Sequence, residues 1–168
     1  MSYDIYIGEA EVRVPEKEDL DEGYNDLEVY VRGLDLPEAP HFPNDDMTGR
    51  SNSRHPGYGQ WSKFTCEAGI NELFFDKEKG GLMRHHPGAC VLTRKDLQAI
   101  SEAKARWMET HPKAVPGWCA CKKCDQLRQR GSDPEHKDLD GVLARLIWLE
   151  WWIGWALEHC RIPTIYNH

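Results

Sequence analysis

The sequence lacks any long uninterrupted apolar run. Its most apolar stretch, "LIWLEWWIGWAL" (146–157), carries a glutamate and is too short to cross a bilayer. The N-terminal "MSYDIYIGEAEVRV" has neither a basic start nor an apolar core, so we expect no signal peptide. These features predict a cytoplasmic protein with no membrane partner.

Basic residues are scarce at the start of the chain. Residues 1–50 contain 4 Lys and Arg against 14 Asp and Glu, whereas residues 51–168 contain 17 against 14. A general nucleic-acid binder needs a basic face, and the acidic first part argues against that class. The mildly basic remainder can still accept a small anion.

Familiar catalytic motifs are missing as well. The chain has no Walker loop, no HExxH, no paired H-x-T/S motif and no G-x-S-x-G elbow. Enzymatic activity is therefore uncertain, and the balance moves toward binding without turnover.

The composition is that of a globular protein. With 168 residues, 40% hydrophobic and 29% charged, the chain predicts one domain, 1–168, with a real core. Tyrosine and β-branched residues in rough alternation predict short strands at 3–8, 11–14 and about 27–34. We expect these three N-terminal strands to form a small antiparallel sheet.

Three main helices are expected to pack with this sheet, which makes the fold class α+β. Apolar spacing predicts a helix over 61–76, and the capping pair Thr93 and Asp96 predicts another that ends before Pro112. The last and longest helix is rich in tryptophan. We expect Asp133 to cap it and the helix to run to about Cys160.

Half of the six cysteines gather in one short segment. "GWCACKKC" (117–124) contains Cys119, Cys121 and Cys124. A Cys-x-x-Cys pair lets two thiolates reach one tetrahedral ion, which predicts a structural zinc site with His136 as the fourth ligand. Other candidates for that ligand are His111, Cys90 and Cys160. Residues of about 111–132 would then be a zinc-stabilised insertion; reduced surface thiols and redox use are the alternatives.

Arginine and histidine precede Pro-Gly twice. "SRHPGYGQW" (53–61) contains Arg54 and His55, and "LMRHHPGAC" (82–90) contains Arg84 and His85. A guanidinium fork suits phosphate or carboxylate, imidazole adds a titratable donor, and Pro-Gly fixes a turn. Two converging turns would bind a small anionic ligand. The alternative is that each segment only makes its own turn.

Three further residues extend this predicted ligand site. Tyr58 and Trp61 follow the first Pro-Gly and could stack on the ring of a nucleotide-derived ligand. Glu150 falls in the apolar stripe of the last helix, where a buried carboxylate needs a cationic partner. The candidate partners are Arg54, Arg84 and His85. Alternatively, Glu150 lies at a helix edge and is solvated.

Four segments of the chain, "MSYDIYIG", "SRHPGYGQW", "LMRHHPG" and "LARLIWLEWWIGWALEHC", are similar to small proteins of tailed bacteriophages that have no known activity. The "WCACKKC" segment is not part of the shared pattern. The resemblance implies a setting in the host cytoplasm, where small phage proteins often bind a host protein or sequester a nucleotide signal.

The leading hypothesis is non-enzymatic binding or sequestration of a small anionic, for example nucleotide-derived, ligand. In the phage setting the protein would act in counter-defence. A phosphodiesterase or hydrolase that uses the same arginines and histidines on a nucleotide is the first alternative. A protein-interaction module is the second. Homodimerisation through the tryptophan-rich helix is compatible with all three.

Overall fold

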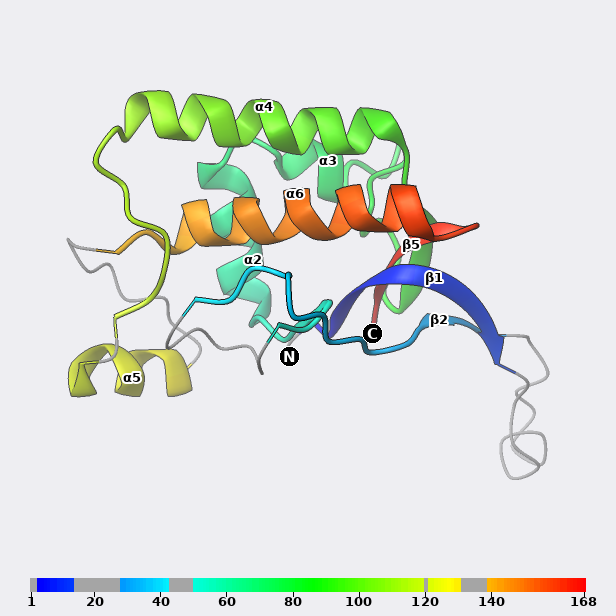
Figure 1. Ribbon diagram of the computed structural model, residues 1–168, viewed down its shortest axis with the longest axis horizontal. Helices are drawn as coiled ribbons and strands as arrows, with labels where there is room; N and C mark the ends of the chain where they lie inside the picture. Colours follow the sequence, from blue (N-terminus) through cyan, green and yellow to red (C-terminus); the bar gives the residue numbers. More distant parts are fainter. Residues whose placement is uncertain (1–2, 14–27, 43–49, 120, 131–138) are drawn as a thin grey trace.

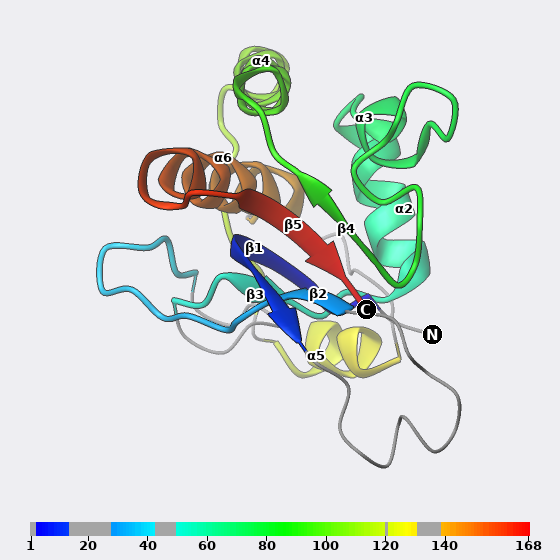
Figure 2. The same cartoon turned by 90° about the vertical axis from the view of Figure 1, so that its right-hand side faces the viewer.

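The computed structural model describes residues 3–13, 28–42, 50–119, 121–130 and 139–168. This part of the chain forms an antiparallel sheet covered by helices (Figures 1 and 2). The strands are β1 (Ile5–Arg13), β2 (Glu28–Val31), β3 (Ser53–Arg54), β4 (Gly88–Val91) and β5 (Pro163–Asn167). The helices are α2 (Tyr58–Glu67), α3 (Asn71–Phe75), α4 (Arg94–Thr110), α5 (Lys122–Gln129) and α6 (Gly141–His159).

The sheet joins the two ends of the described chain. Its order is β2-β1-β5-β4, with β3 also paired to β1. Ile7 of β1 lies opposite Ile165 of β5, and both are fully buried. The predicted strands 3–8 and 11–14 fall largely on the one continuous strand β1, which covers residues 5–13, and β2 lies within the third predicted strand. The expectation of about three strands was too low, because β3, β4 and β5 also join the sheet.

Helix α6 forms the centre of the core. Figure 2 shows α6 against one face of the sheet and α4 outside it. Leu146, Trp148 and Trp152 of α6 are fully buried, as the apolar pattern predicts. The described helix begins at Gly141, where the Asp140 side chain accepts the Leu143 N–H. The predicted cap Asp133 lies outside the described residues, whereas the predicted end at Cys160 is confirmed.

The structure confirms one of the two other predicted helices and divides the second. The capping box of α4 is confirmed, since the Asp96 carboxylate accepts the Thr93 N–H at 2.7 Å. The single helix expected over 61–76 is wrong, because α2 ends at Glu67 and α3 starts at Asn71. Gly69 has a φ of +69°, and the Ile70 N–H returns to the Thr65 carbonyl at 2.8 Å. This left-handed glycine ends α2, although the apolar spacing continues beyond it.

No described helix combines the length and the apolar character needed to cross a membrane.

Candidate functional site

The first Arg-His turn faces the core through its arginine. Pairing of β3 with β1 turns Arg54 inward, where it is 1% exposed. Its guanidinium lies 4.9 Å from the ring centroid of Trp118 and 5.2 Å from that of Trp148. Arg54 therefore helps to build the interior, stabilised by the negative faces of two indoles.

The other predicted ligand-binding residues of the segment 53–61 also contribute to the structure. His55 is exposed, and its Nδ1 lies 2.7 Å from the Asp4 carboxylate. The Tyr58 ring lies 4.0 Å from that of Tyr3, and burial, followed by the nearby Tyr58, raises the pKa of Tyr3 to about 12. Trp61 is fully buried in the core and has no surface to offer a ligand.

The second turn lies beside the first, but its arginine does not join Arg54. Arg84 and His85 are exposed. The neighbouring His86 makes the contact, with its ring 5.4 Å from that of Tyr58. The two turns therefore meet through aromatic rings, while one guanidinium faces the core and the other faces solvent. The structure does not place the predicted Arg54 and Arg84 around a shared pocket.

Glu150 has a different partner from those expected. Its carboxylate contacts Nζ of Lys104 on α4, and the two side chains are about a quarter exposed. This ion pair joins α4 to α6 at the edge of their interface, and none of the three expected partners takes part. Glu150 thus contributes to the contact between α4 and α6.

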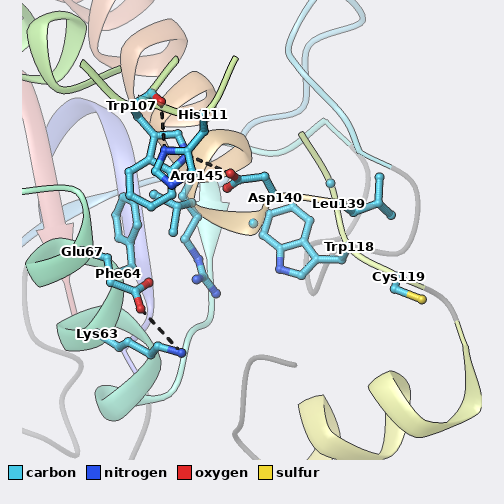
Figure 3. A pocket seen from close by; sticks show the side chains of 13 residues that line it. Lys63, Phe64, Glu67, Trp107, His111, Trp118, Cys119, Leu139, Asp140 and Arg145 are labelled. Atoms are coloured by element: carbon cyan, nitrogen blue, oxygen red, sulfur yellow. Dashed lines mark hydrogen bonds and ion pairs between the residues drawn. The ribbon is translucent and has the colours of Figure 1, made fainter. Parts of the chain in front are cut away.

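A pocket of about 310 Å³ lies elsewhere, between α2, the end of α4 and the start of α6 (Figure 3). The segment 117–119 closes another side. The cationic and aromatic side chains that line the pocket are Lys63, Phe64, Trp107, His111, Trp118 and Arg145. The sequence analysis predicted none of these residues as part of the anion-binding site. The presence of Arg145 inside the most apolar helix was the one signal that could have indicated it.

Flat rings dominate the walls of this pocket. The rings of Trp107 and His111 stack at 4.0 Å with an interplanar angle of 15°. The Arg145 guanidinium lies 5.6 Å from the ring centroids of both Phe64 and Trp118. Figure 3 shows the Lys63 ammonium and the Arg145 guanidinium both below the stacked rings of Trp107 and His111. The pocket therefore offers stacking surfaces beside two cationic groups.

The two acidic side chains on the wall are already engaged. Both oxygens of Asp140 accept hydrogen bonds at 2.8 Å, one from the Leu143 N–H and one from the Trp107 indole N–H. Glu67 lies 3.6 Å from the Lys63 ammonium. The Glu67 carboxylate is thus paired with a cation, and both oxygens of Asp140 already have hydrogen-bond donors, so neither carboxylate lacks a partner beside the pocket.

The predicted thiol cluster is present. The sulfur atoms of Cys119, Cys121 and Cys124 all lie within 4.8 Å of one another, so the three cysteines could hold a metal ion. The backbone N–H of Cys124 is the main cause that lowers the pKa of Cys121 to about 7, while burial raises that of Cys124 to about 11. We call these three cysteines the thiol triad. The expected fourth ligand, His136, lies outside the described residues.

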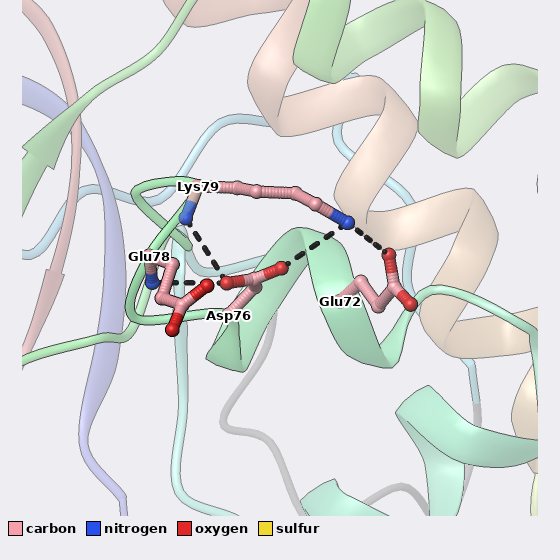
Figure 4. A network of polar contacts seen from close by, with 4 residues as sticks. All are labelled: Glu72, Asp76, Glu78 and Lys79. Carbon is pink, nitrogen blue, oxygen red and sulfur yellow. Dashed lines mark hydrogen bonds and ion pairs between the residues drawn. The ribbon is translucent and has the colours of Figure 1, made fainter.

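A second polar cluster lies on the surface around the turn after α3 (Figure 4). The Lys79 ammonium lies 3.0 Å from Glu72 and 3.4 Å from Asp76. The Lys79 N–H, followed by the Glu78 N–H, holds the pKa of the Asp76 carboxyl below its usual range. Because Glu72 and Lys79 are largely exposed, this cluster contributes little beyond holding the turn after α3.

Comparison with known proteins adds no assignment to this geometry. No protein family model, no curated protein and no solved structure matches the chain. The pocket and the thiol triad are therefore the features of the described structure that bear on function.

Proposed function

We propose that the protein binds a small anionic ligand with a planar ring in the pocket between α2, α4 and α6. The observation that carries this proposal is the joint presence of Lys63, Arg145 and three aromatic rings around one cavity. A ring would stack against Trp107, whose side chain is partly exposed, and its acidic group would point to the cationic side.

Pocket size limits the ligand. Ligand pockets span roughly 300–1,000 Å³, and this one, at about 310 Å³, is at the lower end. One ring system with one acidic group matches such a volume. A nucleoside monophosphate is the test case, because nucleobases stack well on indoles and a phosphate suits a guanidinium.

Both cationic residues are suited to anions for different reasons. Arg145 is 2% exposed, so its guanidinium acts in a low-dielectric surrounding where charge-assisted hydrogen bonds are strong. Lys63 is half-exposed and can swing between Glu67 and a ligand. The arrangement supports binding, and the hydrolase alternative has no comparable support because His111 is the only pocket histidine among the described residues.

Calorimetric titration with AMP and with adenosine tests the proposal. The phosphate should tighten binding, and Lys63→Met should weaken AMP binding about tenfold while leaving adenosine unchanged. Lys79→Met is the matched control, since it removes a lysine of the surface cluster that does not line the pocket. If AMP binds no better than adenosine, or if the two variants behave alike, the anion site is not in this pocket.

We also propose that the thiol triad binds zinc as a structural ion. Thiolates are preferred ligands of zinc, and structural sites are rich in cysteine. Metal analysis of the purified chain should give one zinc per protein, lost in Cys121→Ser and kept in Cys66→Ser, whose exposed thiol lies outside the triad. Equal zinc content in both variants would contradict a site at the triad.

Sequestration of a nucleotide signal in a phage-infected host is the most specific form of the ligand proposal. It combines the proposed ligand class with the phage setting that the sequence resemblance would imply, and heat release of bound small molecules followed by mass spectrometry would identify such a ligand. Homodimerisation through α6 stays a prediction, which size-exclusion chromatography with light scattering checks.

A further inference from the structure

The pocket and the thiol triad share one wall. Cys119 lines the pocket and also belongs to the triad. Its neighbour Trp118 is 4% exposed and presents its ring to Arg145. Any change in the position of Cys119 therefore moves a residue that shapes the pocket.

The wall is fixed firmly at its beginning. The Asp140 N–H donates to the Val115 carbonyl at 2.7 Å, and the Gly117 N–H donates to the Asp140 carbonyl at 3.1 Å. These two bonds tie the chain to the start of α6. Trp118 then fits closely, since a Cβ added at Gly141 would lie 2.9 Å from its indole nitrogen.

The other end of the wall depends on the triad. Cys124 is the one buried side chain that the structure describes on α5, Leu127 is half-buried, and the others described there are exposed. An eight-residue helix has little stability by itself. Figure 1 shows α5 at the edge of the molecule, apart from α4 and α6. Besides the covalent chain itself, the close approach of the three thiols joins α5 to residues 117–119.

We infer that metal binding at the thiol triad orders the pocket wall of Trp118 and Cys119 and so strengthens ligand binding. The ion would anchor the far end of a segment that Asp140 already anchors at the near end. A rigid wall lowers the conformational entropy lost when a ligand binds beside residues 118–119. This inference rests on the proposed function, because it names a regulator of the same pocket.

Coupling of this kind is reciprocal. If zinc raises the affinity for AMP by a given factor, AMP must raise the affinity for zinc by the same factor. Couplings between sites usually amount to roughly 5–150-fold. We expect about tenfold, because the ion would order one of several walls.

The test uses the full chain in metal-free form and with one equivalent of zinc, with AMP as the probe. Zinc should tighten AMP binding about tenfold in calorimetry. It should also slow hydrogen exchange of the Trp118 and Cys119 amides. Cys121→Ser should abolish both effects and Cys66→Ser neither, while magnesium in place of zinc should have no effect because it avoids thiolates.

The outcomes separate this inference from the proposed function. Equal AMP affinity with and without zinc overturns the coupling, although the pocket proposal stands. Tighter AMP binding without zinc also overturns it. If AMP binds in neither state, the pocket proposal fails and the coupling fails with it. A zinc effect that persists in Cys121→Ser would place the metal elsewhere and refute the inference.

Discussion

Replacement of Asp140 by alanine should destabilise the protein more than the loss of an ordinary helix cap. Its carboxylate accepts the Leu143 N–H at the start of α6 and the Trp107 indole N–H at the end of α4, each at 2.8 Å. One side chain thus caps the central helix and ties a second helix to it. Asp140→Ala removes both bonds at once.

The size of the effect follows from the two bonds. An N-cap lost to alanine costs about 1 kcal/mol. The bond from the indole to the carboxylate adds about 1.5 kcal/mol, the low end for charged partners, because Trp107 is partly exposed to water. We expect a loss of about 2–3 kcal/mol, or a fall in melting temperature of about 5–10 °C for a chain of this length.

Urea unfolding followed by circular dichroism measures this difference. Thr93→Ala, which removes a cap at the exposed start of α4, is the matched control and should cost about 1 kcal/mol. A double-mutant cycle with Trp107→Phe should give a coupling of about 1 kcal/mol to Asp140. If Asp140→Ala costs no more than Thr93→Ala, the link between α4 and α6 does not contribute as argued.

Three further predictions concern other parts of the molecule. The pKa of Tyr3 is raised from an ordinary 10 to about 12, so the fold favours the protonated phenol. This contribution to the free energy of unfolding is complete below pH 10, and about 2–3 kcal/mol of it is lost between pH 10 and 12. Tyr3→Phe should reduce the fall of the unfolding free energy with pH over that range, and an unchanged slope against pH would contradict this prediction. Burial, with the Glu9 carboxylate, raises the pKa of the Cys160 thiol to about 11, so iodoacetamide at pH 8 should label Cys160 roughly tenfold or more slowly than the exposed Cys66. Mass spectrometry checks the rates, and Glu9→Gln should speed the labelling of Cys160. Gly81→Ala should cost at least about 2 kcal/mol in urea unfolding, because its Cβ would lie 2.6 Å from a main-chain oxygen of α3; a neutral result would mean that the turn yields easily.

Local patterns in the sequence predicted those elements that local interactions determine. The capping box of Thr93 and Asp96 lies within one turn, and the apolar periodicity of α6 repeats over several turns. The thiol triad was predictable for the same reason, since its members fall within six residues. The break at Gly69 was missed because apolar spacing continues across it, whereas a glycine with positive φ stops the helix.

Long-range pairing explains what the sequence did not show. Strand β5 pairs with β1 across most of the chain, and nothing in "PTIYN" names its partner. The two-residue strand β3 is too short for an alternating pattern, so the inward direction of Arg54 was not readable. The pocket draws its walls from α2, α4, α6 and residues 117–119, and such a set is assembled only by the tertiary fold.

Trp118 connects the three features that bear on function. Its indole contacts the guanidinium of Arg54 at 4.9 Å and that of Arg145 at 5.6 Å, so one ring stabilises two buried cations. Arg145 lines the pocket, and the residue after Trp118 is the first thiol of the triad. A substitution at this position would therefore disturb the core, the pocket and the metal-binding cysteines together. Variants that separate these roles must leave Trp118 in place and act on Lys63, which lines the pocket, or on Cys121, which belongs to the triad and does not line the pocket.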